Sequence, residues 1–185
     1  DTNPIDEKRE YVDAFKNDLE WLKIRYDGEY YASDSIEEVY RYGELAIESG
    51  NAYACWCSKE KMSNDRWNSV ECEHRSIPAP ESLSIFKDMA YKKTEREGAA
   101  IRLKLDMESQ NTAMRDPIIF RRVNYPHYRH GDKYRLWPKY EFNTPIMDSI
   151  HGITHAIRSK EYELRDEMYD VVLDILSLRK PVLHS

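Results

Sequence analysis

Apolar side chains recur along the first 50 residues at the spacing of amphipathic helices. A first helix is predicted from Asn3 and Pro4, which suit the N-cap and first helical position, to about Leu22. A short strand is expected near residues 30–32. A second helix, capped by Ser33 or Asp34, should end at Gly50. The apolar faces are expected to hold Tyr11, Phe15, Leu19 and Leu22 in the first helix and Ile36, Tyr40, Gly43 and Ile47 in the second.

Beyond residue 50 the pattern changes to short strands and loops. Residues 99–106 set Ile101, Leu103 and Leu105 against alternating charged residues, which predicts a strand with one exposed face. Together with a helix over 81–91, this pattern indicates an antiparallel α+β unit. The remaining expected elements are strands over Ala52–Cys57, Ile118–Val123 and Tyr140–Ile146, and a last amphipathic helix over Leu164–Leu178.

Composition and charge narrow the class of protein. The 185 residues carry a net charge of -6, and no run of about 18 apolar residues exists, so no membrane span is expected. We therefore expect a cytoplasmic protein with neither a membrane nor DNA as partner. The charge is uneven: residues 1–50 hold 14 acidic and 6 basic side chains, whereas residues 115–139 hold 7 basic and 2 acidic ones.

The basic segment 115–139 is interleaved with aromatic residues, and this combination suits an RNA backbone and unstacked bases. A solvated strand face is the alternative. Its proposed stacking residues are Tyr125, Tyr128, Tyr134 and Trp137. The cations of this segment expected to contact such a backbone are Arg115, Arg121, Arg122, Arg129 and Lys133.

All three cysteines fall into one group with a histidine: Cys55 and Cys57, then Cys72 and His74. Alternate residues of a strand point to one face, so each pair could present two ligands to one ion. Three thiolates and an imidazole satisfy tetrahedral zinc, for which we expect a structural role. Buried cysteines acting as small hydrophobes are the alternative, and a disulfide is disfavoured by the odd number of cysteines.

A lone cation, Arg158, lies among apolar and small polar side chains in residues 140–162. Its planar guanidinium cannot be neutralised and offers two parallel hydrogen bonds to a carboxylate, as a receptor for an acidic small molecule would. A surface salt bridge to Glu161 or Glu163 is the alternative.

Three blocks of sequence, in order along the chain, carry a family pattern. The first is Asp-Thr-Asn-Pro at 1–4, and the second combines Met-Arg-Asp-Pro at 114–117, Pro-His at 126–127 and Gly-Asp-Lys-Tyr at 131–134. The third comprises Tyr140, Phe142, Pro145, Ile146, Asp148, Ser149, Ile150, Gly152, Thr154, His155, Arg158, Glu161 and Tyr162. Together they resemble the catalytic core of glutamyl-tRNA synthetases of the archaeal and eukaryotic kind.

This resemblance implies an α/β fold with parts of both halves of a Rossmann-type nucleotide-binding fold. Residues 1–33 would end the first half, residues 34–139 would form the acceptor-stem-binding insertion with its zinc knuckle, and residues 140–185 would begin the second half. The His-Ile-Gly-His and Lys-Met-Ser-Lys signatures that bind ATP in this family are absent from the chain. We therefore expect the chain by itself to be inactive.

The resemblance also implies an aminoacyl-tRNA ligase that uses ATP and Mg²⁺ to attach L-glutamate to the 3′ end of tRNA(Glu). Arg158 would hold the glutamate side chain, with Tyr140 and Thr144 in the same pocket. The residues placed near adenosine are Ser159, Glu161 and Tyr162.

Related functions give three alternatives. Glutaminyl-tRNA synthetases share the flanking residues but have a cysteine where Arg158 stands. A paralogue that glutamylates a tRNA base and a non-catalytic tRNA-binding module are the other two.

Overall fold

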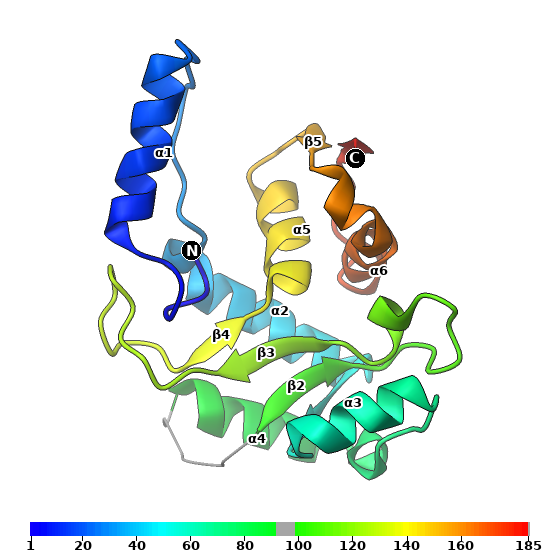
Figure 1. Cartoon of the computed structure of the whole chain (residues 1–185). Helices are drawn as coiled ribbons and strands as arrows, with labels where there is room; N and C mark the ends of the chain where they lie inside the picture. Colours follow the sequence, from blue (N-terminus) through cyan, green and yellow to red (C-terminus); the bar gives the residue numbers. More distant parts are fainter. Residues whose placement is uncertain (92–98, 185) are drawn as a thin grey trace.

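A four-stranded antiparallel sheet lies at the centre of the molecule (Figure 1), as the alternation in residues 99–106 predicts. The computed structural model describes residues 1–91 and 99–184. The strands lie side by side in sequence order: β1 (Ala52–Cys55), β2 (Ala100–Leu103), β3 (Ile118–Arg122) and β4 (Leu136–Pro138). Pro138, which has no backbone N–H to donate, lies on the edge strand β4, where a missing donor is tolerated.

Two helices cover one side of this sheet with a closely packed aromatic core. They are α2 (Ile36–Glu48) and α4 (Ala79–Tyr91), both predicted from the sequence. The ring of Tyr40 from α2 packs 5.8 Å from Phe86 of α4 and 5.9 Å from Phe120 of β3. Gly43 allows this approach, because a Cβ there would lie 2.7 Å from Phe120 Cε2. Gly50 has φ +75° just after α2, as a helix-ending glycine does.

The predicted exposed face of β2 is wrong at Arg102, whose side chain is fully buried. Its Nε donates to the carbonyl of Asp116 at 2.8 Å, and its guanidinium lies 5.6 Å from the Tyr53 ring. The buried Asp116 carboxylate accepts from the amide of Leu105 and from Arg75 Nε. Arg102 Nη2 has no hydrogen-bond partner among the described residues, so these contacts offset only part of the cost of burying a charged side chain at a position that alternation assigns to solvent.

Residues 140–150 form helix α5 (Tyr140–Ile150), and the strand predicted over Tyr140–Ile146 is wrong. A short apolar run fits a strand or a helix, and the sequence pattern alone does not distinguish the two. The helix contains Pro145 and buries Phe142 and Ile146, which are four residues apart and share one face. The backbone N–H that Pro145 lacks would have bonded the carbonyl of Glu141.

The C-terminal residues form a parallel strand pair joined by a helix. Strand β5 (His155–Ile157) pairs with β6 (Val182–His184), and between them lie the 3-10 helix η4 (Lys160–Arg165) and α6 (Asp166–Ile175). The last predicted helix is thus confirmed over α6. In Figure 1, α5 and α6 lie above the central sheet and α4 lies below it.

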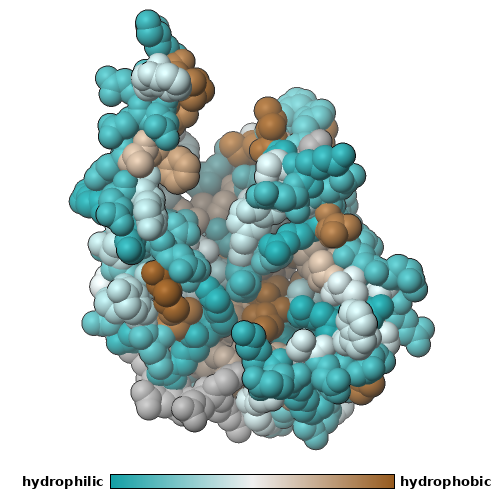
Figure 2. All heavy atoms as spheres, viewed as in Figure 1, coloured by the Kyte–Doolittle hydropathy of each residue, from teal (hydrophilic) through white to brown (hydrophobic). Residues whose placement is uncertain are grey.

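Helix α1 (Arg9–Trp21) stands away from the rest of the molecule, as Figures 1 and 2 show. It begins later than predicted, because residues 4–6 form a turn. Its apolar stripe is not buried: Phe15 is 69% exposed, and a groove between the helix and residues 26–31 contains Val12 and Leu19. The strand expected near 30–32 is absent from the described residues, and the 3-10 helix η1 (Ala32–Ser35) begins there instead.

Three further helical segments were not predicted. Helix α3 (Lys59–Trp67) begins after Ser58, whose hydroxyl accepts a hydrogen bond from the amide of Lys61. The other two are the 3-10 helices η2 (Glu73–Ser76) and η3 (Thr112–Met114). Within residues 1–91 and 99–184, none of the helices has the length and apolar character that a bilayer crossing needs.

Candidate functional site

Arg158 follows β5 directly, and its backbone N–H donates to the carbonyl of His184 at 2.8 Å. Its side chain is only 6% exposed, so it does not lie in bulk solvent. The guanidinium carbon lies 5.7 Å from the ring centroid of Tyr140, 5.3 Å from that of Tyr162 and 5.2 Å from that of Tyr169. Three aromatic rings therefore surround the cation, and we call this group the arginine pocket.

The acidic partner of Arg158 is Asp166, whose Oδ1 lies 3.2 Å from Nη1. The alternative of a salt bridge to Glu161 or Glu163 is wrong, because both glutamates are exposed and no ion pair joins either to Arg158 in the described residues. Arg158 Nε and Nη1 are buried without a hydrogen bond among those residues. A carboxylate that reached the guanidinium would thus find unused donors in a mostly dry pocket.

Helix α5 forms one wall of the arginine pocket. Tyr140, Thr144 and Asp148 are spaced four residues apart and so share one face of the helix. Asp148 accepts a hydrogen bond from the hydroxyl of Tyr169 at 2.9 Å. Burial raises the pKa of the Asp148 carboxyl, which the Tyr169 hydroxyl and the nearby Arg158 partly counteract. Burial also raises the pKa of Tyr169, so that hydroxyl stays a neutral donor at neutral pH.

The structure brings some of the predicted pocket residues together and leaves others exposed. Arg158, Tyr140 and Tyr162 meet, and the rings of the two tyrosines lie 5.0 Å apart. Ser159 and Glu161 are exposed at the start of η4. Sequence reasoning missed Asp166 and Tyr169, although their spacing of three residues in a predicted helix places them on neighbouring turns of one face.

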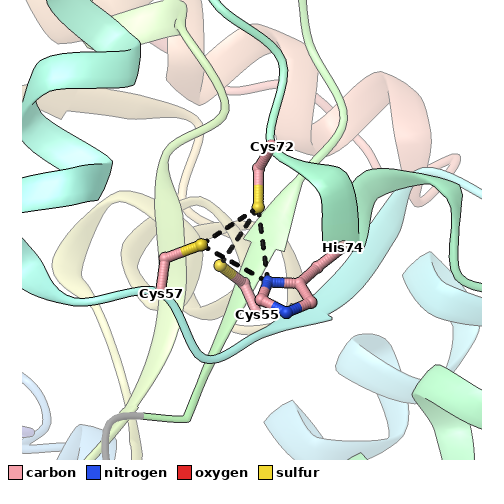
Figure 3. A group of neighbouring side chains, drawn as sticks. All are labelled: Cys55, Cys57, Cys72 and His74. Carbon is pink, nitrogen blue, oxygen red and sulfur yellow. Dashed lines mark hydrogen bonds between the residues drawn. The ribbon is translucent and has the colours of Figure 1, made fainter.

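The cysteine and histidine side chains converge on one point (Figure 3). Cys72 Sγ lies 3.7 Å from Cys55 Sγ, 3.3 Å from Cys57 Sγ and 3.4 Å from His74 Nδ1. All four ligand atoms lie within 4.8 Å of one another, and the residues are buried. Ligands about 2.3 Å from a tetrahedral zinc ion are separated by about 3.7 Å, so the donor set fits zinc in both chemistry and spacing.

The local structure of this cluster differs from the prediction in one respect. Cys55 ends strand β1, but Cys57 lies beyond it, and Cys72 and His74 come from the turn into η2 rather than from a strand. None of the three cysteines forms a disulfide. Burial and the neighbouring sulfurs raise the pKa of the Cys57 thiol to about 12. A cation at the centre would counteract this effect by stabilising the thiolates.

The predicted RNA-contacting cations all have partners within the protein. Arg129 donates to Asp34 at 2.9 Å and stacks 3.7 Å from the Tyr31 ring, and Lys133 pairs with Glu37 at 3.0 Å. The other three contact oxygens of the chain: Arg115 at the carbonyls of Ser109 and Arg66, Arg121 at Asn3 Oδ1, and Arg122 at Asn124 Oδ1.

The interleaved aromatic residues are only partly available to bases. Trp137 is fully buried and Tyr134 is 6% exposed, so both belong to the core and cannot act as stacking platforms. Tyr125 remains exposed. The basic segment is therefore a structural element as much as a surface.

A cationic cleft that the sequence did not indicate lies where α3, β3 and α5 meet. It is lined by Arg66, Lys139 and Arg165 with one acidic residue, Glu141, to which Arg165 is paired. Burial lowers the pKa of Arg66, and its Nε has no hydrogen-bond partner among the described residues. An anion entering this cleft would meet an excess of positive charge.

The family model for the catalytic domain of class I tRNA synthetases (E and Q) matches residues 1–185. Glutamate–tRNA ligases of Nitrosopumilus maritimus and Cenarchaeum symbiosum are each 43% identical, over 181 and 183 residues, which is 98% and 99% of this chain. The chain spans 32% of the length of each of these relatives.

Solved structures show the same fold. The crystal structure of a glutamate tRNA ligase from Elizabethkingia meningosepticum in complex with its amino acid superposes with a TM-score of 0.66 at 21% identity. It matches over 99% of this chain and 40% of that one. The chain therefore belongs to the family of class I tRNA synthetase catalytic domains specific for glutamate or glutamine.

Proposed function

We propose that this chain is the glutamate-recognising part of a glutamyl-tRNA synthetase, which activates L-glutamate with ATP and transfers it to the 3′ end of tRNA(Glu). The observation that carries the proposal is the shielded guanidinium of Arg158 inside the arginine pocket. The names of the relatives, all glutamate–tRNA ligases, support it.

Arg158 suits a carboxylate better than an amide for a physical reason. The guanidinium favours a carboxylate, because its Nε and Nη1 have no hydrogen-bond partner among the described residues and hydrogen bonds between ionised groups are about twice as strong as those between neutral groups. Glutamine offers an amide, which is neutral and presents two donors that the guanidinium cannot accept from. Tyr140 and Thr144 on α5 would line the remainder of the amino-acid site.

Substitution of Arg158 tests this assignment on the full-length protein. Arg158→Ala should abolish glutamate-dependent pyrophosphate exchange with ATP, whereas Arg179→Ala, which removes an exposed arginine that donates to the carbonyl of Ile153, should not. Unchanged affinity of the Arg158→Ala protein for glutamate would refute the assignment.

Nucleotide binding is proposed for the residues beside the same pocket. Ser159, Glu161 and Tyr162 lie at the start of η4, and we place the adenosine of ATP against them. ATP and Mg²⁺ supply the phosphoryl chemistry, which in this reaction depends on alignment and charge stabilisation rather than on an acid–base pair. That the chain alone is inactive stays a prediction.

A structural zinc ion is proposed for Cys55, Cys57, Cys72 and His74. These residues would hold the ion with three sulfurs and one nitrogen, and no open position is needed for catalysis. The ion would connect the end of β1 to η2 and so fix the segment that contains α3.

Contact with the acceptor stem of tRNA(Glu) is proposed for Arg115, Arg121, Arg122, Arg129 and Lys133, together with the cationic cleft. Since Arg129 is paired with Asp34 of η1 and Lys133 with Glu37 of α2, RNA phosphates would have to share or replace these partners. Arg121→Glu with Arg129→Glu should weaken tRNA binding and flatten its salt dependence. Lys180→Glu, a reversal at an exposed pair with Asp174, is the matched control, and equal effects would refute the contact.

The alternatives are a glutaminyl-tRNA synthetase, a paralogue that glutamylates a tRNA base, and a non-catalytic RNA-binding module. Arg158 favours glutamate over glutamine for the reason given above. A cytoplasmic location is proposed, because relatives such as the one from Dictyostelium discoideum are named cytoplasmic.

A further inference from the structure

The first residue of α6, Asp166, meets the guanidinium of Arg158 inside the arginine pocket. Its Oδ1 lies 3.2 Å from Nη1, and the two side chains are 28% and 6% exposed. A pair this well shielded from water is screened far less than one on the surface. The ion pair with Asp166 therefore influences the position of the Arg158 guanidinium.

The other acidic side chain near Arg158 is Asp148, and its hydrogen-bond partner is Tyr169. Burial favours the neutral form of the Asp148 carboxyl. Glu161 and Glu163 are exposed. Among the described residues, Asp166 is thus the acidic side chain that forms an ion pair with Arg158.

The three nitrogens of the guanidinium are not equivalent. Nε and Nη1 are buried, and Nη1 faces Asp166. Neither Nε nor Nη1 has a hydrogen-bond partner among the described residues, so both keep donors that an incoming carboxylate can use. The three tyrosine rings lie 5.2–5.7 Å from the guanidinium carbon, and Asp166 contacts the group through Nη1.

We propose that Asp166 is a positioning residue for substrate recognition: it holds Arg158 between the rings of Tyr140, Tyr162 and Tyr169 and orients its guanidinium for the side-chain carboxylate of the amino acid. This inference rests on the proposed function. Without Asp166 the guanidinium would lose its counterion in the empty pocket and would have several rotamers available, which substrate binding must then restrict.

The test uses the full-length protein and glutamate-dependent pyrophosphate exchange. Asp166→Asn keeps the shape of the side chain and removes its charge, and it should raise the KM for glutamate about tenfold, the effect of losing one positioned charge contact. The change in kcat should be smaller than about threefold, because the reacting groups are untouched. Asp166→Glu, which restores the charge on a longer arm, should recover part of the loss.

Glu167→Gln is the matched control. It removes the same charge from the same first turn of α6, but Glu167 contacts Asn111 instead of Arg158. An unchanged KM in Asp166→Asn, or an equal rise in Glu167→Gln, overturns the inference. A fall in kcat alone, as expected for a poorly folded variant, overturns it as well. If the unmodified protein shows no glutamate-dependent exchange, the proposed function itself fails.

Discussion

Removing one ligand of the cysteine and histidine cluster gives a sharp test of metal binding. Cys72 is the best ligand to remove, since its sulfur contacts the other three ligand atoms at 3.3–3.7 Å. Serine at this position is nearly the same size and forms hydrogen bonds, but its oxygen is a poor zinc ligand at neutral pH. We expect Cys72→Ser to lose the response to zinc and to keep the fold.

The size of the response follows from linkage, because the four ligand atoms already lie within 4.8 Å of one another. An ion that binds only the folded protein and is present at 100 times its Kd stabilises it by about 2.7 kcal/mol. A chain of this size gains about 2–4 °C in Tm for each kcal/mol, so zinc should raise Tm by about 5–11 °C.

The assay is thermal unfolding of protein treated with a chelator and then supplied with Zn²⁺ or Mg²⁺. Zinc should raise the Tm of the unmodified protein and of His155→Gln, which changes an exposed histidine outside the cluster. Magnesium should have no such effect, since it prefers oxygen ligands. If Cys72→Ser gained as much from zinc as the unmodified protein, or if neither gained, the four side chains would not form a zinc site.

Three other predictions concern stability and can be measured by urea unfolding. Gly43→Ala should destabilise the protein by about 1 kcal/mol. The added methyl group would overpack against the buried Phe120 ring at a cost of about 1–3 kcal/mol, which outweighs the gain in helix propensity of about 1 kcal/mol. A variant more stable than the unmodified protein would contradict this prediction. Burial lowers the pKa of His127 from 6.5 to about 4, so the unfolded chain takes up its proton first as the pH falls. The free energy of unfolding should therefore decline as the pH falls from 6.5 to 4, by at most about 1.4 kcal/mol per pH unit for this one proton. His127→Gln should reduce this decline. Equal pH dependence of the free energy of unfolding in the two proteins would refute the role given to His127. Asp116→Asn should cost about 3–5 kcal/mol, since it leaves Arg75 without its buried partner, and a loss below about 1 kcal/mol would show that the network is dispensable.

Local signals in the sequence predicted those features that depend on neighbouring residues alone. The helical spacing of Ile36, Tyr40, Gly43 and Ile47 predicted the buried face of α2, and Gly50 marked its end. The ligand types of the metal cluster were also recognisable, because few residue combinations suit zinc so well.

The sequence did not predict the features that depend on contacts between residues far apart in the chain. Arg102 alternates like a solvent-facing residue, yet Asp116, fourteen positions later, provides the carbonyl that accepts its hydrogen bond. Residues 140–146 fit a strand by pattern, but they form helix α5, which continues through Pro145 and buries Phe142 and Ile146 on one face. Asp166 lies eight positions beyond Arg158, and the packing of the C-terminal elements brings the two side chains together.

The parallel pair of β5 and β6 has a practical consequence for handling the protein. Within the described residues these two strands pair only with each other, and Ile157 and Val182 on them are 85% and 52% exposed. A strand with unpaired backbone N–H and C=O groups and exposed aliphatic side chains can pair with a strand of another polypeptide. Concentrated solutions of these 185 residues should therefore self-associate through this pair, and a lysine in place of Ile157 should keep them dispersed.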